Sequence, residues 1–282
     1  MNDEHMTIEE LKRPQPILTI IIPVYNAERT LRRCLESVDN QIDERVQVII
    51  IDDGSTDNSI EIASEFAMMG CTYRFNETNT GVSWSRSRGL RLAEGKYVTF
   101  LDSDDELAPG AIDKMCNAAL VADQTNRKDY IVQFNHARKY EGVEALSHKY
   151  DNKAGYYTLN NLPNRWVFVW NKIYSQEFLQ HHGIFFNDKL QFGEDEIFNL
   201  DCLRFCEGIT CVDAVTVIKH FDNPDSLCHT VTKERLLALC EVLMDMLRQP
   251  NRTRQYKAAI RGILAEHWNS KLYKTFFGGE KS

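Results

Sequence analysis

The chain has 282 residues, of which 43% are hydrophobic and 26% charged, and its formal net charge is −8. This composition is that of a globular protein and excludes a disordered or collagen-like chain. The acidic balance disfavours nucleic acid as a partner, because nucleic-acid binding needs a basic surface, and no apolar run reaches the about 18 residues that span a bilayer.

Strand-like and helix-like stretches alternate through the first half of the chain. Runs rich in β-branched apolar residues predict strands over residues 17–22, 46–51, 71–75 and 96–101. Apolar residues at helical spacing, with capping or helix-ending residues beside them, predict helices over residues 27–38, 57–67, 83–93 and 109–122. Continuous apolar strands separated by helices indicate a mainly parallel sheet with helices on both faces. The loops after these strands should therefore converge at one edge of the sheet.

The second half is less regular. The pattern predicts a strand over residues 130–134, a polar loop over 136–163, a strand or helix start over 166–174, a helix over 194–205 and a strand over 212–219. Helix signals dominate residues 232–277 and are broken near Pro250. We divide the chain into an N-terminal arm (1–15), a main domain (16–231, with halves 16–125 and 126–231) and a C-terminal helical extension (232–282).

The N-terminus and the cysteines indicate the compartment. The first residues are polar and acidic and lack the basic start and apolar stretch of a secretion signal. The eight cysteines form no CxxC pair and no zinc-type spacing. We therefore expect buried free thiols in a cytoplasmic protein.

Loops that offer several ligand-binding side chains follow each of the first four predicted strands, and the residues that we single out come from these loops. These residues are Pro23, Tyr25 and Glu28 in the first loop, Asp52 and Asp53 in the second, Arg86 and Arg88 beyond the third, and Asp102, Ser103, Asp104 and Asp105 in the fourth. Clustered carboxylates repel one another unless a cation lies between them, and Mg²⁺ or Mn²⁺ takes oxygen ligands. Taken alone, the acidic loop is better interpreted as a solvated turn before the helix that follows Pro109. Three ligand-like loops at the same edge favour the metal site.

Other residues keep two interpretations open. Tyr25 could stack on a nucleotide base or pack as an aromatic core residue. Arg86 could pair with a diphosphate, for which a guanidinium is suited, or lie on the surface of an ordinary helix. Glu194 and Asp195 could be catalytic acids or helix N-terminal acids favoured by the helix dipole.

Together these blocks resemble inverting family 2 glycosyltransferases with the GT-A fold. The similar blocks, in the family's order and spacing, are IIPVYNAERTLRRCLESV, IIIDDGSTDNS, NTGVSWSRSRGL and LAEGKYVTFLDSDDEL, with VWNKIYSQEFL and FGEDEIF later in the chain. The resemblance is strong over residues 16–115. The chain departs from the family around Arg86, where Trp84, Ser85 and Ser87 stand in place of small residues and an asparagine.

The resemblance implies a role for each candidate residue. Residues implied to contact the nucleotide base or its phosphates are Pro23, Tyr25, Asp53 and Arg86, with Glu28 supporting the first loop. Asp102, Ser103 and Asp104 occupy the DxD motif, and Asp104 or Asp105 is the implied ligand of Mn²⁺ or Mg²⁺. Asp195, with Glu194 beside it, corresponds to the catalytic base.

The implied reaction is transfer of a sugar from a nucleotide-diphosphate donor, a uridine one by expectation, to a hydroxyl of a saccharide or lipid-linked saccharide acceptor. It proceeds with inversion, and the common setting is cell-surface polysaccharide or lipid-linked glycan synthesis. A non-catalytic nucleotide-sugar-binding module is one alternative. An aspartate-nucleophile phosphohydrolase is another, but Glu106 stands where that class has threonine or valine.

The acceptor side and a membrane contact are less defined by the sequence. The family borders its acceptor with a segment that here contains Trp166, Trp170, Asn171 and Lys172, although aromatic residues are as often core. His220 is a further candidate contact of the metal or diphosphate, and residues 226–229 a candidate flap. A basic stretch could contact anionic lipid at the inner face of a membrane, or form a solvated helix face. It consists of Arg248, Arg252, Arg254, Lys257 and Arg261.

Overall fold

The computed structural model describes residues 14–68, 70–125, 130–140, 152–163, 166–220, 231–250 and 252–269. Most of the predicted N-terminal arm and the candidate flap at 226–229 lie outside these residues. Among the described residues, no helix is both long enough and apolar enough to span a lipid bilayer.

The first half of the chain contains the elements that its sequence predicts, with boundaries shifted by a few residues. They are β1 (Leu18–Val24), α1 (Leu31–Asp39), β2 (Val46–Asp52), α2 (Ser59–Met68), β3 (Thr72–Phe75), α3 (Val82–Leu92), β4 (Tyr97–Phe100), β5 (Glu106–Leu107) and α4 (Ala111–Gln124). The predicted alternation of strands and helices is confirmed here. The two-residue strand β5 was not predicted, because a strand that short has no periodic pattern.

The second half holds the elements β6 (Ile131–Lys139), β7 (Gly155–Thr158), β8 (Lys172–Ser175), α5 (Gln176–His182), α6 (Glu194–Leu203), β9 (Gly208–His220), α7 (Lys233–Arg248) and α8 (Arg254–Asn269). The predicted strand over 130–134 is confirmed as the start of β6, but the predicted loop over 136–163 is wrong at 136–139, which continue β6, and at 155–158, which form β7; residues 141–151 lie outside the described residues. The polar residues of β6 misled the pattern: Asn135 and His136 are buried, and the Asn135 amide donates to Asp213 at 2.9 Å.

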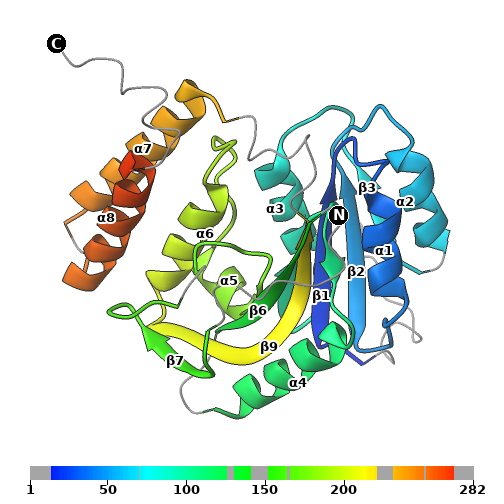
Figure 1. Cartoon of the computed structure of the whole chain (residues 1–282), viewed down its shortest axis with the longest axis horizontal. Helices are drawn as coiled ribbons and strands as arrows, with labels where there is room; N and C mark the ends of the chain where they lie inside the picture. The colour runs from blue at the N-terminus through cyan, green and yellow to red at the C-terminus, as the bar shows by residue number, and fades with distance from the viewer. Residues whose placement is uncertain are drawn as a thin grey trace, which may run out of the picture.

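Within the described residues, the strands form one nine-stranded sheet with the order β3-β2-β1-β4-β8-β6-β9-β5, and β7 pairs with β9. Strands β3, β2, β1 and β4 are parallel to their neighbours, and β8 is antiparallel to both β4 and β6. The sheet is therefore mixed, and the carboxyl ends of the first four strands meet at one edge, as predicted (Figure 1).

The long curved strand β9 reaches back toward that edge. It pairs with β7 near its start, with β6 along most of its length and with β5 near its end. In Figure 1 its long yellow ribbon curves along the lower part of the molecule, next to β7 and β6. Because β5 directly follows the acidic loop, the pairing of Glu106 with Ile218 places Lys219 and His220 next to that loop.

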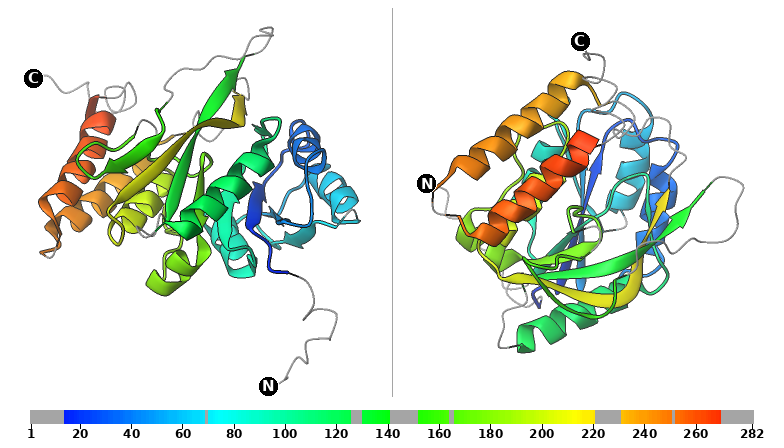
Figure 2. Two further views of the ribbon diagram at one scale, coloured as in Figure 1. Left: turned by 90° about the horizontal axis from the view of Figure 1, so that it is seen from below. Right: turned by 60° about the vertical axis from the view of Figure 1, so that its left-hand side comes forward.

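Helices cover both faces of the sheet. One core cluster joins residues of α1, α2 and α4 to one face, and a second joins α3, α5 and α6 to the other. Helices α7 and α8 pack on the outer side of α6 around Leu200, Leu239 and Ile260, at the end of the molecule away from α2 (Figures 1 and 2). The predicted break between these two helices is confirmed.

The seven cysteines among the described residues are all free, and four of them are buried. This agrees with the expectation of free thiols. Burial raises the pKa of the Cys34 and Cys202 thiols well above the usual value, so both stay protonated and pack as small apolar side chains.

Candidate active site

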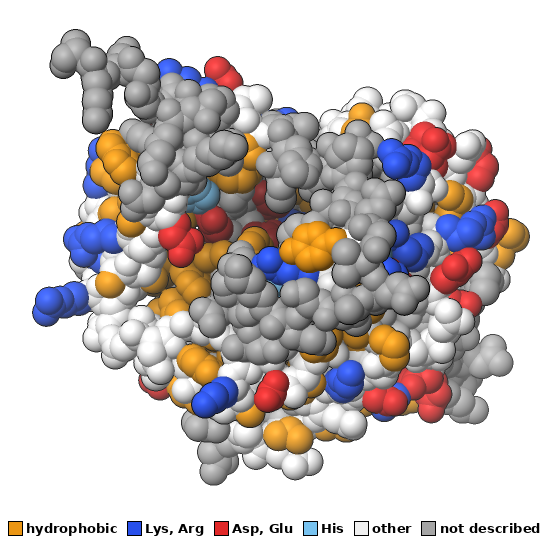
Figure 3. Space-filling model, in the orientation of Figure 1, with side chains coloured by type: hydrophobic (Ala, Val, Ile, Leu, Met, Phe, Trp, Pro, Cys, Tyr) orange, Lys and Arg blue, Asp and Glu red, His pale blue; other side chains and the backbone are white. Residues whose placement is uncertain are grey.

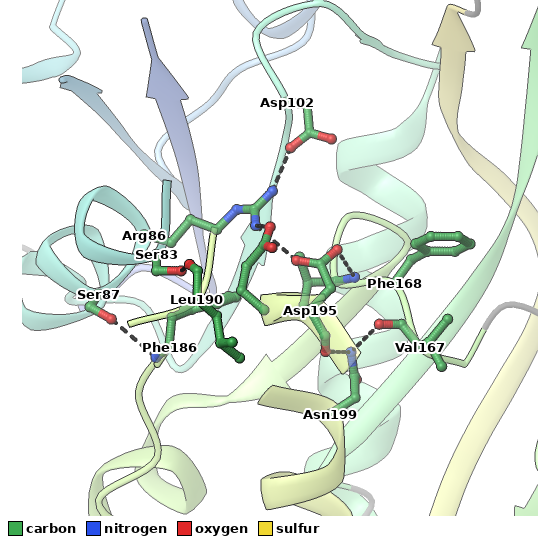
Figure 4. A network of polar contacts seen from close by, with 12 residues as sticks. Ser83, Arg86, Ser87, Asp102, Val167, Phe168, Phe186, Leu190, Asp195 and Asn199 are labelled. Carbon is green, nitrogen blue, oxygen red and sulfur yellow. Dashed lines mark hydrogen bonds and ion pairs between the residues drawn. The ribbon is translucent and has the colours of Figure 1, made fainter. Parts of the chain in front are cut away.

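Arg86 lies at the centre of a charge network that joins segments far apart in the sequence. Its Nη2 donates to Asp102 Oδ1 at 2.8 Å, and its Nη1 donates to Glu194 Oε1 at 3.0 Å and to Asp195 Oδ1 at 2.8 Å. Only 5% of the Arg86 side chain is exposed, and the guanidinium lies 5.4 Å from the centre of the Phe186 ring. Figure 4 shows the guanidinium between the loop after β4 and the first turn of α6. Arg86 is thus not an ordinary surface arginine.

The two acids are held at the first turn of α6 by local geometry. Gly193, with φ of +73°, precedes the helix, and a Cβ there would lie 2.4 Å from Leu239 Cδ2. The backbone N–H of Val169 donates to Asp195 Oδ2 at 3.3 Å. The side-chain amide of Asn199 donates to the backbone carbonyls of Asp195 and Val167, both at 2.9 Å. These contacts fix the direction in which the Asp195 carboxylate points (Figure 4).

The environment of Asp195 favours its protonated form. Burial raises the pKa of Asp195 to about 7, the charges of Glu194 and Asp102 add to this effect, and Arg86 opposes it. A carboxylate with a pKa near neutrality is suited to accept a proton at physiological pH. The interpretation of Glu194 and Asp195 as ordinary helix N-terminal acids does not account for their shared contact with Arg86.

The acidic loop after β4 gathers three carboxylates. One oxygen from each of Asp102, Asp104 and Asp105 lies within 4.8 Å of the others. Asp102 and Asp104 are partly exposed, with Ser103 between them also partly exposed, whereas Asp105 is fully buried. The grouping matches what the sequence predicted for a divalent cation site.

Lys219 belongs to this cluster and was missed by the sequence analysis. Its Nζ donates to Asp102 Oδ2 at 2.9 Å and to Asp105 Oδ2 at 2.6 Å, and it lies 5.1 Å from the centre of the Trp170 ring. In the sequence Lys219 is only a lysine at the end of an apolar run. The pairing of β5 with β9, which brings it to the acids, has no signature that one sequence reveals.

Asp105 is buried within the acidic loop, where it contacts His220 at the end of β9. Asp105 Oδ1 accepts from the backbone N–H of His220 at 3.0 Å, while Oδ2 accepts from Lys219. Burial raises the pKa of Asp105 to about 7, with Asp104 and Asp102 adding to the shift and Lys219 opposing it. The His220 ring lies against Glu106, with 2.6 Å between Nε2 and Oε1. Asp104 is therefore the more accessible of the two predicted metal ligands.

The first two loops are joined by hydrogen bonds. Glu28 Oε2 accepts from the backbone N–H of Asn58 at 3.1 Å and from its side-chain amide at 2.9 Å. Pro23 lies in β1, paired with Ile51 of β2, and Tyr25 is 48% exposed. The exposure of Tyr25 excludes the interpretation of its ring as a core residue.

Asp53 holds the third loop. Its Oδ1 accepts from the Asn76 amide at 2.7 Å and from the backbone N–H and hydroxyl of Thr80 at 2.9 and 2.6 Å. Its Oδ2 accepts from the backbone N–H of Gly81 at 2.6 Å. The carboxylate is 3% exposed and so connects the second loop to the start of α3, on which Arg86 lies.

The candidate acceptor segment is mainly core. Trp170, Asn171 and Lys172 are all 5% exposed or less, whereas Trp166 is partly exposed. The Lys172 ammonium donates to the backbone carbonyl of Phe168 and to Asn171 Oδ1. Burial lowers the pKa of Lys172 to about 7. Trp170, Asn171 and Lys172 therefore pack in the core, which was the second of the two interpretations of this segment.

One face of the molecule has a hollow that contains acidic side chains. Figure 3 shows red acidic side chains recessed near the middle of the face seen in Figure 1. A separate surface cavity of about 670 Å³ lies along β3 and the outer side of α3, lined among others by Phe75, Trp84 and Arg88. None of the five acids around Arg86 and Lys219 lines that cavity. The candidate active site is therefore identified by its charged residues, which come together from distant segments, and not by this cavity.

The sequence matches a known family and several curated proteins. The family model described as glycosyl transferase family 2 matches residues 19–181. Among curated proteins, "Putative glycosyltransferase EpsH" of Bacillus subtilis (strain 168) is 27% identical over 266 residues, which cover 89% of this chain and 75% of EpsH. "Uncharacterized glycosyltransferase YibD" of Escherichia coli (strain K12) is 44% identical over 107 residues, 38% of this chain and 31% of YibD.

Solved structures share the fold. S. aureus TarS 1–349 in complex with UDP-GlcNAc superposes with a TM-score of 0.77 at 20% identity, over 94% of this chain and 76% of that one. The mannosyltransferase PcManGT from Pyrobaculum calidifontis, in complex with GDP-Man and Mn²⁺, gives a TM-score of 0.64 at 15% identity, over 92% of this chain and 73% of that one. The GT-A expectation for the sheet and helices is thus confirmed.

Proposed function

This chain belongs to glycosyl transferase family 2 and is a glycosyltransferase, and we propose that it transfers a sugar from a uridine-diphosphate donor to a saccharide hydroxyl with inversion. The single observation that carries the proposal is the Arg86 network. One guanidinium contacts both Asp102 of the acidic loop and the candidate base Asp195, which are 93 residues apart in the sequence. The donor and the acceptor proton would meet at this point.

The donor would bind across the converging loops. The exposed ring of Tyr25 offers a stacking surface for a base. Asp53 Oδ2, which accepts one hydrogen bond from Gly81, has a further lone pair for a base imide. The uridine assignment is supported by the TarS complex with UDP-GlcNAc, whose fold this chain shares. The expected sugar is a hexose or an N-acetylhexosamine.

The oxygen donors of the acidic loop fit Mn²⁺ or Mg²⁺, which bind proteins through one or two carboxylates together with substrate phosphates. Asp104, partly exposed, would hold the ion, with the buried Asp105 as its neighbour. A bound cation would neutralise charge on the leaving diphosphate. Arg86 would contribute a second positive charge on the same side.

Asp195 would act as the general base. Its carboxylate accepts the proton of the acceptor hydroxyl as that oxygen attacks the anomeric carbon from the face opposite the diphosphate. Arg86 and the Val169 N–H orient the carboxylate, and the raised pKa gives it a basicity matched to neutral solution. A single displacement of this kind inverts the configuration.

A test compares the wild type with Asp195→Asn in a UDP-release assay containing UDP-sugars, Mn²⁺ and saccharide acceptors. We expect the variant to bind UDP as the wild type does and to lose at least about 100-fold in transfer, the usual contribution of a general base. Asp188→Asn, the same change at an exposed position before α6, is the matched control. Transfer at the wild-type rate by Asp195→Asn would remove Asp195 from this role, and binding without any turnover by the wild type would favour a non-catalytic module.

The setting that we propose is the cytoplasmic face of a membrane, with a lipid-linked or polysaccharide acceptor. Exposed basic residues on α7 and α8, Arg248, Arg254 and Arg261, would contact anionic lipid. Co-sedimentation with phosphatidylcholine vesicles containing or lacking phosphatidylglycerol tests the contact. Binding should rise with the anionic fraction and fall in Arg254→Glu/Arg261→Glu, and binding that is independent of the anionic lipid would contradict it.

A further inference from the structure

Lys219 occupies the position between two acids of the loop in which a divalent cation would be expected. Its ammonium donates to Asp102 Oδ2 and Asp105 Oδ2 at 2.9 and 2.6 Å. The other oxygens of these two residues are also engaged, since Asp102 Oδ1 accepts from Arg86 and Asp105 Oδ1 from the His220 backbone N–H. A metal ion that used either carboxylate would have to displace a contact that the fold already makes.

The lysine is held in place by the fold. Its side chain is 18% exposed, packs over the Trp170 ring, and extends from β9 where β5 and β6 flank that strand. The Asp105 side chain that it contacts is fully buried. The ammonium is therefore a built-in cation of the loop and not a solvent-facing lysine that happens to lie nearby.

We propose that Lys219 is a fixed counter-ion for Asp102 and Asp105, and that it makes binding of a divalent cation at Asp104 depend on the presence of the nucleotide diphosphate. The inference deepens the proposed function and rests on it for the identity of the nucleotide. With Lys219 in place, the loop offers a metal ion less negative charge than its three carboxylates suggest. A diphosphate supplies the missing negative charge and oxygen ligands, so ion and nucleotide bind together.

The test measures Mn²⁺ binding directly, by the loss of the free-Mn²⁺ electron paramagnetic resonance signal, with and without UDP. For the wild type we expect weak binding of Mn²⁺ alone and at least about tenfold tighter binding with saturating UDP. Lys219→Met should bind Mn²⁺ without UDP at least about tenfold more tightly than the wild type, because a unit positive charge has been removed within a few ångströms of the ion. Lys219→Arg, which keeps the charge, should stay weak.

Lys139→Met is the matched control. Lys139 is the neighbour of His220 across the β6–β9 pair, its ammonium lies 3.8 Å from Glu106, and its side chain is 45% exposed. Removing this charge should change Mn²⁺ affinity less than about twofold, because solvent screens it. If Lys219→Met does not fold, Asp105→Asn/Lys219→Met is compared with Asp105→Asn, and the double variant should bind Mn²⁺ alone more tightly.

The outcomes separate this inference from the proposed function. Unchanged Mn²⁺ affinity in Lys219→Met, or tight Mn²⁺ binding by the wild type without UDP, would overturn the role of Lys219 while UDP binding stands. Failure of the wild type to bind UDP at all would contradict the proposed donor. In that case a Lys219→Met variant that binds Mn²⁺ alone more tightly would still support the counter-ion, whereas an unchanged affinity would refute it.

Discussion

Replacing Arg86 by methionine removes the cation that Asp102, Glu194 and Asp195 share. The Arg86 side chain is 5% exposed and lies 2.8–3.0 Å from each carboxylate, so solvent cannot replace its charge without opening the site. Removing one partner of a buried ion pair typically costs about 3–5 kcal/mol, and the lost contact with Phe186 adds about 0.5–1 kcal/mol. We expect Arg86→Met to lower the free energy of unfolding by about 3.5–6 kcal/mol at pH 8.

The loss should depend on pH with a defined sign. Without the guanidinium the pKa of Asp195, already raised by burial, rises further above its unfolded-state value. A folded-state carboxyl pKa above the unfolded one means that the folded state binds more protons, so stability falls as pH rises. The deficit of Arg86→Met relative to the wild type should therefore be largest at pH 8 and shrink toward pH 5.

Urea unfolding followed by tryptophan fluorescence and circular dichroism measures both effects. Arg88→Met is the control, because Arg88 lies two residues along α3, is only partly buried, donates to the Phe75 carbonyl and to Asn76 Oδ1, and packs 5.5 Å from the Trp84 ring. The variant should lose about 1–2 kcal/mol, that of two ordinary hydrogen bonds, and the loss should be equal at both pH values. Equal deficits for the two variants, or a deficit of Arg86→Met that is the same at pH 5 and pH 8, would refute the shared-cation account.

Three further predictions concern the start of α6. Transfer by the wild type should rise with pH through about 7, the pKa of Asp195, because the base must be ionised, and a rate profile flat from pH 5.5 to 8.5 would contradict this. Burial lowers the pKa of His267, but the hydrogen bond and the charge of Glu196 together outweigh burial, so this pKa is raised. The ion pair therefore stabilises the folded state fully below the unfolded-state pKa near 6.5, and this contribution is lost as the pH rises through the folded-state pKa. His267→Ala should therefore lose about 1–2 kcal/mol at pH 6 and less at pH 8.5 in thermal unfolding, whereas an equal loss at both would exclude the ion pair. Gly193→Ala should lose about 1–3 kcal/mol, since its Cβ would meet Leu239 at a positive φ, and should slow transfer; normal stability in urea would show that the turn is not needed.

The parallel half of the fold could be predicted because its signals are local. Strands such as 17–22 and 46–51 are continuous apolar runs, and chain handedness then brings their following loops to one edge. The position of Asp102 and Asp104 follows from that rule alone. Glu194 and Asp195 were found by resemblance and not by periodicity. They lie in the first turn of α6, and only the packing of that helix against the sheet brings them beside the acidic loop.

The contacts that determine the electrostatics could not be predicted. Lys219 and Asp102 are 117 residues apart, and their contact depends on β5, a strand of two residues, pairing with the end of β9. The start of β6 was predicted as a strand over 130–134, but its continuation to Lys139 was missed, because Asn135 and His136 are polar and the partner of the Asn135 amide, Asp213, comes beside it only through tertiary pairing. Tertiary pairing, and not local pattern, decides such positions.

The most direct test of the site is a crystal grown with UDP and Mn²⁺ and measured at a wavelength where manganese scatters anomalously. The account predicts an anomalous peak bonded to Asp104 and to the diphosphate, with the uracil ring against Tyr25. A diphosphate bound elsewhere, for instance in the cavity along β3 and α3, or a manganese ion away from Asp104, would contradict it.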